Sequence, residues 1–188
     1  MRFVVIDGLD ASGKDTQAEI IKEMYESMGE KVILRSHPCS DNIYGAKARE
    51  ALWRDGKRRR LEASTYYAMD VIHSVRNYYG KADTLIFVRY LCGAAYLPYP
   101  LAKSMYHGFS ALLPSTDYKF FIDVDPEVAI DRINGRPRKQ MFENIRSLRK
   151  VRNRVLRLVD DWHIIDGSRP QDDVTEQICQ IIDKLDRY

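Results

Sequence analysis

The feature that most constrains this chain is a glycine-rich segment that directly follows an apolar run. Residues 2–7 have the composition of a buried strand, and residues 14–28 have helical spacing of apolar side chains. Between them lies Gly8-Leu9-Asp10-Ala11-Ser12-Gly13-Lys14, a G-x-x-x-x-G-K spacing in a strand–loop–helix context. Glycines let backbone N–H groups turn toward a phosphate, and a helix N-terminus favours an anion. The segment therefore predicts a nucleotide-phosphate site, in which Lys14 would reach the β- and γ-phosphates of a donor.

Short apolar runs alternate with helical patterns along the whole chain. We expect strands at 2–7, 31–35, 84–88, 118–124 and 163–166, and helices at 14–28, 42–52, 61–79, from 125 onward, 139–160 and 173–185. Alternation with nearly continuous apolar strands favours a parallel sheet covered on both faces. With the glycine-rich loop, this predicts an α/β fold: a single P-loop NTPase domain over residues 1–188, a three-layer sandwich with about five strands. The polar or proline-containing segments 54–60 and 98–100 are expected to be exposed loops.

Composition narrows the class of protein further. The three cysteines are odd in number and form no C-x-x-C pair, which favours a reducing, cytoplasmic setting. No apolar run approaches the ~20 residues of a membrane helix, so we expect no membrane association. The formal charge is +3, but ten Lys or Arg residues and a single acid fall between positions 132 and 157. Such a concentration predicts an anionic ligand near this region.

The residue after Lys14 departs from the usual phosphate-loop pattern. A Ser or Thr at that position normally holds Mg²⁺, whereas this chain has Asp15 followed by Thr16. A carboxylate can bind Mg²⁺, but it also brings negative charge close to the phosphates. We expect Thr16 to support the α-phosphate. The predicted ATP site comprises Gly8, Asp10, Ala11, Ser12, Gly13, Lys14, Asp15 and Thr16.

Beyond the loop, the chain resembles the thymidylate kinases, a family of P-loop nucleoside-monophosphate kinases. Its loop is similar to the family's G-x-D-x-x-G-K-T-T-Q, and further matches run nearly from end to end. They are R-S-H-P at 35–38 for the family's R-E-P, G-A-K-A-R at 45–49, Y-Y-A-M-D at 66–70 for F-A-A-D, R-Y at 89–90 for D-R-Y, and F-I-D-V-D-P-E at 121–127. The resemblance implies transfer of the γ-phosphate of ATP, with Mg²⁺, to a nucleoside monophosphate. The expected reaction is dTMP to dTDP, and the expected assembly is a homodimer.

The resemblance also implies a role for each matching residue on the acceptor side. Asp10 would approach the 3′-hydroxyl of the acceptor sugar, and Tyr67 would stack on the base. Arg89 would grip the acceptor phosphate. Further expected acceptor-site residues are Arg35, Asp70 and Tyr96.

Residues 132–150 resemble the arginine-rich lid of the family. The phosphate loop carries Ala11 and Ser12 where one branch of the family places an arginine. The lid would then have to supply the positive charge of the transition state, and the candidates for this role are Arg132, Arg136 and Arg138.

Three further positions depart from the family pattern. The aspartate of D-R-Y is Val88, the thymine-contacting arginine after F-A-A-D is Val71, and the lid arginine before Phe-Glu is Met141. These changes leave the metal ligand and the preferred base open. We hypothesise that Asp15 supplies the carboxylate missing at Val88 and is the metal ligand. The competing interpretation is that Asp15 marks a protein that has lost catalysis.

Other functions remain compatible with the sequence. One is a kinase for a different acceptor, because Val71 removes the thymine contact and because G-K-D also occurs in polyphosphate kinases. Another is a nucleotide-binding protein without turnover. A nucleic-acid binder that uses the basic stretch is less favoured, and its affinity would fall with rising salt.

Overall fold

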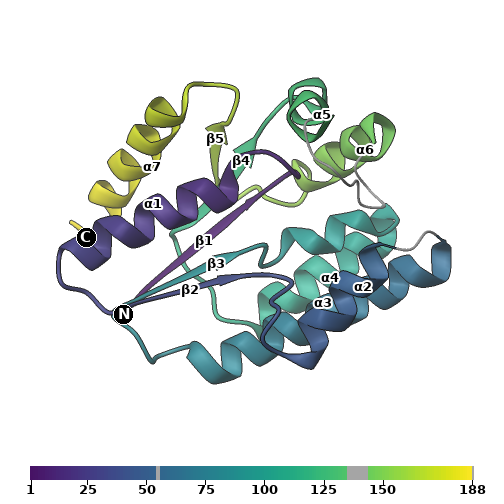
Figure 1. The fold of residues 1–188 in the computed structure, drawn as a ribbon, viewed down its shortest axis with the longest axis horizontal. Coiled ribbons are helices and arrows are strands. Elements are labelled where there is room, and N and C mark those ends of the chain that lie inside the picture. Colours follow the sequence, from purple (N-terminus) through teal and green to yellow (C-terminus); the bar gives the residue numbers. More distant parts are fainter. Residues whose placement is uncertain (54–55, 135–143, 188) are drawn as a thin grey trace.

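The computed structural model describes residues 1–53, 56–134 and 144–187. Its centre is one five-stranded sheet in the order β2-β3-β1-β4-β5, with every neighbouring pair parallel (Figure 1). The strands are β1 (Arg2–Gly8), β2 (Val32–Ser36), β3 (Thr84–Val88), β4 (Lys119–Asp123) and β5 (His163–Asp166). The sheet and its helical layers confirm the predicted α/β sandwich.

Alternate residues of β1, β2, β3 and β4 contribute to two separate cores, because side chains of a strand point to opposite faces in turn. On one face, Val4 and Ile6 of β1 pack with apolar residues of α1 (Lys14–Ser27) and α7 (Gln171–Leu185). On the other face, Phe3 and Val5 pack with residues of five further helices. These are α3 (Lys57–Tyr78), the short 3₁₀ helix η1 (Cys92–Tyr96), α4 (Tyr99–Leu112), α5 (Pro126–Asn134) and α6 (Ile145–Val155).

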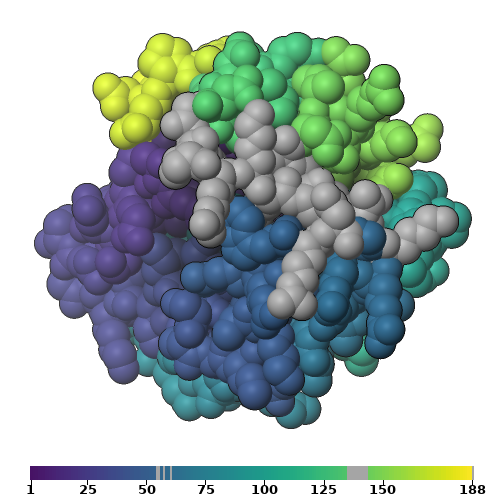
Figure 2. Space-filling model, turned by 45° about the vertical axis from the view of Figure 1, so that its right-hand side comes forward, coloured from purple at the N-terminus to yellow at the C-terminus, as the bar shows by residue number. Residues whose placement is uncertain are grey.

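The helix α2 (Ile43–Leu52) lies mainly against α3 and follows the edge strand β2. Asn42 begins it, because the Asn42 side chain accepts hydrogen bonds from the N–H groups of Tyr44 and Gly45 at 3.0 Å each. Figure 2 shows a face that carries the purple N-terminal segment, the blue α2 region and the green α5–α6 region. None of the helices within the described residues is long and apolar enough to cross a membrane.

Two interpretations of the connecting segments are wrong. Residues 98–100 were expected to be an exposed loop, but Tyr99 and Pro100 form the first turn of α4. A proline is compatible with a first helical turn, since the N–H that it lacks has no intrahelical acceptor there. The run 54–60 was also expected to be a loop, yet α3 already begins at Lys57, whereas residues 54–55 lie outside the described residues.

The last long helix is shorter than expected. A helix was predicted over 139–160, but α6 ends at Val155, and residues 139–143 lie outside the described residues. After α6 the chain turns to bury Leu158, Val159 and Trp162 in the core before β5. The Trp162 indole N–H donates to the Tyr106 hydroxyl at 2.8 Å, which ties this turn to α4.

Candidate active site

The glycine-rich loop connects β1 to α1 at the carboxyl ends of the strands, the usual ligand-binding edge of a parallel sheet. A Cβ at Gly8 would lie 2.7 Å from the carbonyl oxygen of Ile122 on β4, so only glycine lets the loop pass this close to the sheet. Two loop residues have left-handed backbone, Ala11 at φ 61° and Gly13 at φ 93°. Gly13 precedes α1, whose first N–H groups have no intrahelical acceptor and are available to a phosphate.

Lys14 is almost completely buried beneath this loop. Its ammonium group donates to the Leu9 carbonyl oxygen at 2.9 Å. Burial, assisted by the positive charge of Arg89, lowers the pKa of Lys14 to about 8. The lysine is therefore held inside the loop, close to where a phosphate would enter.

Arg89 follows β3 with a left-handed backbone at φ 58°, a conformation that costs a non-glycine residue roughly 1–3 kcal/mol. The surrounding chain fixes it. The Tyr67 hydroxyl donates to the Arg89 carbonyl oxygen. The buried carboxylate of Asp7 accepts the N–H groups of Tyr90 at 2.9 Å and Cys92 at 3.2 Å. Backbone strain that the surroundings hold in this way is typical of a functional residue.

The Arg89 guanidinium lies between two carboxylates, Asp10 of the loop and Asp15 of the first turn of α1. Its NH2 is 3.5 Å from Asp10 Oδ1, and its NH1 is 3.2 Å from Asp15 Oδ1. Burial opposes ionisation of both acids, but Lys14 and Arg89 hold the pKa of Asp10 and of Asp15 below its usual value. Both carboxylates are therefore negative at neutral pH.

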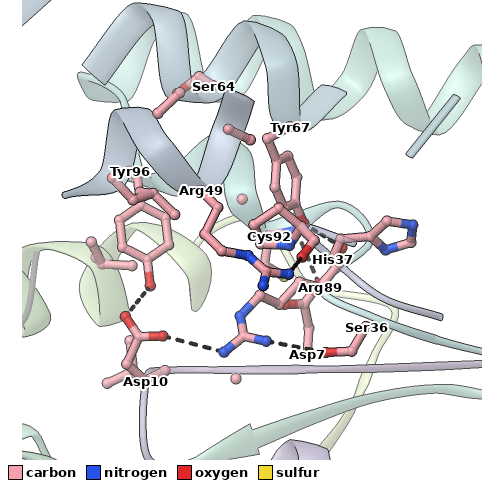
Figure 3. Close-up of a pocket in the computed structure, with 18 of the residues that line it drawn as sticks. Asp7, Asp10, Ser36, His37, Arg49, Ser64, Tyr67, Arg89, Cys92 and Tyr96 are labelled. Atoms are coloured by element: carbon pink, nitrogen blue, oxygen red, sulfur yellow. Dashed lines mark hydrogen bonds and ion pairs between the residues drawn. The ribbon is translucent and has the colours of Figure 1, made fainter. Parts of the chain in front are cut away.

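A cavity of about 510 Å³ opens on one side of Arg89 (Figure 3). The predicted residues Asp10, Tyr67, Arg89 and Tyr96 all line it, together with Gly8. The Tyr96 hydroxyl donates to Asp10 Oδ2 at 3.0 Å, which fixes this carboxylate at the cavity wall. Polar and apolar groups thus converge in one hollow, as expected for a small-molecule site.

A second cavity of about 380 Å³ lies at the phosphate loop and the start of α1. It is lined by residues 11–17, from the loop and the first turn of α1, and by residues of the turn between β5 and α7, such as Arg169. Arg132 also lines it and donates to the carbonyl oxygens of Ala11 and Gly167 at 3.2 Å each. Arg89 belongs to the walls of both cavities.

Two predicted acceptor residues do not line the larger cavity. Arg35 pairs with Asp41 and stacks over the ring of Tyr78, with its Cζ 4.4 Å from the ring centroid. Asp70 is fully buried, and its oxygens accept from the Cys39 N–H and the Asn42 side-chain amide at 2.7 Å each. Their positions indicate that they shape the loop between β2 and α2.

The two valine departures lie in the core. Val71 packs among the apolar residues of the α3 face, and Val88 packs among those of the α1 face. Neither lines the two cavities at Arg89, and Val71 instead borders a small cavity of about 10 Å³ beside Tyr67 and Tyr90. Arg136, Arg138 and Met141 lie outside the described residues.

The sequence interpretation did not single out several residues of the site. Asp7, Ser36 and Arg49 line the larger cavity, and Ser36 donates to Asp15 at 2.6 Å. Asp7 could have been found from the sequence, because an acid at the end of an otherwise apolar strand indicates a buried carboxylate with hydrogen-bond partners. Nothing in the sequence indicated Ser36, since only the sheet order places the end of β2 near the phosphate loop.

The side chains of His37, Cys39 and Asp70 gather beside the larger cavity, with ligand atoms within 4.8 Å of one another. Cys39 Sγ donates to the Ser36 carbonyl oxygen at 3.3 Å, and His37 Nδ1 lies 3.1 Å from the Val88 carbonyl oxygen. Asp70 is occupied by its own two donors. The three side chains therefore hold the loop between β2 and α2, which forms part of the cavity wall.

Several arginines of the basic stretch are paired within the protein. Arg152 holds Asp123 at 2.7 and 2.8 Å and Asp125 at 2.7 Å, at the end of β4. Arg154 donates to the carbonyl oxygens of Ala95 and Leu97, beside η1. These contacts join α6 to the end of β4 and to η1. They also leave less of the positive charge of the basic stretch available to a polyanion.

Comparisons with known proteins agree with one another. Residues 6–178 match the family model described as thymidylate kinase. A probable thymidylate kinase 1 of Saccharolobus solfataricus is 31% identical over 192 residues, covering 97% of each chain. A thymidylate kinase of Thermosipho africanus is 28% identical over 198 residues, covering 97% of this chain and 98% of that one. A solved structure of thymidylate kinase from Candida albicans, 20% identical, superposes with a TM-score of 0.78 over 98% of this chain and 92% of that chain.

Proposed function

The chain belongs to the thymidylate kinase family, and from this premise we propose that it transfers the γ-phosphoryl group of ATP to dTMP, giving ADP and dTDP. The observation that supports this most is the position of Arg89 in the walls of two cavities. One cavity contains the phosphate loop and suits ATP, whereas the other contains Asp10, Tyr67 and Tyr96 and suits a nucleoside monophosphate. Phosphoryl transfer depends mainly on positioning and on stabilising charge, so two sites that meet at an arginine fit it well.

On the donor side, the phosphates would bind the N–H groups of the loop and the Lys14 ammonium group. Lys14 would exchange its bond to the Leu9 carbonyl oxygen for a phosphate oxygen. Arg132 already lies at the wall of this cavity and would add positive charge near the transferring group. Arg136 and Arg138 remain predictions for the same task.

On the acceptor side, Arg89 would hold the phosphate of dTMP, and Asp10 would orient the sugar through its 3′-hydroxyl. Tyr67 would stack against the base, since it lines the cavity while its hydroxyl is engaged with the Arg89 backbone. No general base is needed, because an acceptor phosphate oxygen is already anionic.

The residues of the donor cavity also suit Mg²⁺. Asp15 and Thr16 both line this cavity and offer oxygen atoms, the ligands that Mg²⁺ prefers. We propose that Asp15 holds the ion in place of the carboxylate missing at Val88. When bound, Mg²⁺ neutralises charge on the transferring phosphates. A homodimer and a cytoplasmic location belong to the same proposal, and sedimentation at micromolar concentration tests the dimer.

The experiment is an ADP-release assay with ATP and Mg²⁺ against dTMP, dUMP, UMP, CMP and AMP. We expect the highest kcat/KM with dTMP, and Lys14→Ala as a control should abolish turnover with every acceptor. A higher kcat/KM with another monophosphate would show that dTMP is not the preferred acceptor, while the phosphoryl transfer from ATP would stand. Nucleotide binding without any turnover would favour a protein that has lost catalysis.

A further inference from the structure

Asp15 lines the donor cavity, yet its carboxylate is bound by residues of the acceptor cavity. Asp15 Oδ1 accepts from Ser36 Oγ at 2.6 Å and from Arg89 NH1 at 3.2 Å. Ser36 and Arg89 both line the larger cavity, and Asp15 lines the smaller one. The carboxylate therefore reaches across the boundary between the two sites.

Both terminal nitrogens of Arg89, which an acceptor phosphate would also use, face carboxylates. Arg89 NH1 faces Asp15, and Arg89 NH2 faces Asp10 at 3.5 Å. A carboxylate and a phosphate both bind guanidinium through pairs of oxygens, so they compete for these N–H groups. Each carboxylate has a further donor, Tyr96 on Asp10 and Ser36 on Asp15. The Asp10 side chain is 14% exposed and that of Asp15 is 53% exposed, so Asp15 is the carboxylate that can give way.

Asp15 has room to move. Its side chain is 53% exposed and stands on the first turn of α1, where the donor cavity begins. Its second oxygen, Oδ2, lies 3.8 Å from the Lys14 ammonium group, on the donor side. A rotation of the Asp15 side chain would move its carboxylate from Arg89 toward the donor cavity without any change in the helix.

Resting on the proposed function, we propose that Asp15 is an internal competitor for the acceptor phosphate. It pairs with Arg89 in the free protein and releases Arg89 when metal-bound ATP draws the carboxylate into the donor cavity. Binding of the donor thereby strengthens binding of the acceptor, and by linkage the acceptor strengthens binding of the donor by the same factor. A Ser or Thr at position 15 has no charge to compete with, so this coupling belongs to chains with an acid there.

Calorimetric titration of dTMP tests the coupling without measuring turnover. The wild-type protein and Asp15→Ser are each titrated with and without Mg²⁺ and a non-hydrolysable ATP analogue. Without the analogue, we expect Asp15→Ser to bind dTMP about fivefold more tightly, the size expected for loss of a half-exposed ion pair. With the analogue, the wild-type affinity should rise by a similar factor, whereas that of Asp15→Ser should change less than twofold.

Two controls separate this role from a general effect on the site. Thymidine has no phosphate, so its affinity should be the same for both proteins. Asp15→Asn removes the charge at nearly constant size and should behave like Asp15→Ser. Equal dTMP affinity in all three proteins, or coupling that persists in Asp15→Ser, overturns the inference. If dTMP binds to none of them and another monophosphate does, the proposed acceptor is wrong, and the same titration with that monophosphate decides the inference.

Discussion

The Tyr96 hydroxyl lies 3.0 Å from Asp10 Oδ2, although 86 positions separate the two residues in the sequence. The contact joins the 3₁₀ helix after β3 to the phosphate loop after β1. It holds the carboxylate that is expected to orient the acceptor sugar. Tyr96 is therefore a positioning residue that acts through Asp10.

Tyr96→Phe removes this contact and keeps the ring. We expect kcat/KM for dTMP to fall about tenfold, since a hydrogen bond to a charged group contributes about 1.5–3 kcal/mol. The comparison that isolates the effect is 2′,3′-dideoxythymidine monophosphate, which lacks the hydroxyl that Asp10 would orient. Its kcat/KM should hardly change, and an equal loss with both acceptors would assign Tyr96 to packing alone.

Arg89→Lys keeps the positive charge and removes the planar fork. We expect kcat/KM for dTMP to fall by about 10²-fold, because an ammonium cannot bind a phosphate in a bidentate manner. Thymidine affinity, measured by calorimetry, should stay within twofold of wild type. A variant with nearly full turnover would show that Arg89 acts only as a point charge.

Gly93→Ala tests how the Tyr67 ring is supported. A Cβ at Gly93 would lie 2.4 Å from Cε1 of Tyr67, so the ring would have to move and its hydroxyl would leave the Arg89 backbone. We expect a loss of unfolding free energy of about 1–3 kcal/mol in urea, and a higher KM for the acceptor. The matched control is Gly108→Ala in α4, where a Cβ meets nothing within 4 Å. That variant should be neutral or more stable by about 0.5–1 kcal/mol, since alanine favours a helix over glycine.

His37 should make stability depend on pH. Burial lowers the pKa of His37 from its ordinary value of 6.5 to about 4, so the folded protein holds the neutral ring. Between these values the unfolded chain binds more protons, and stability falls as pH decreases from 6.5 toward 4. The slope contributed by His37 approaches about 1.4 kcal/mol per pH unit.

Urea unfolding of the wild type and His37→Gln between pH 4 and 7 measures this slope. We expect the wild-type curve to fall more steeply than that of His37→Gln, whatever the stability of the variant at pH 7. His107→Gln, at an exposed histidine, provides the control and should retain the wild-type slope. Parallel curves for wild type and His37→Gln would contradict the assignment.

Local sequence determined the core of this architecture. β1, the phosphate loop and α1 are contiguous, and their glycine spacing and apolar pattern depend on neighbours only a few residues away. The alternation of strands and helices then predicted the parallel sheet correctly. The start of α4 at Tyr99 escaped prediction, because a pair of prolines indicates a loop as readily as a first helical turn.

Tertiary structure alone decided which charged groups meet. Arg89 and Asp15 are 74 positions apart, and they face each other because β3 lies between β1 and β2 in the sheet. The same order places Ser36 beside Asp15. The packing of α3 against α2 brings the buried Asp70 to the β2–α2 loop. The sequence contains each of these groups, but electrostatic pairing acts over a few ångströms. It could be assigned only once the fold had brought the side chains together.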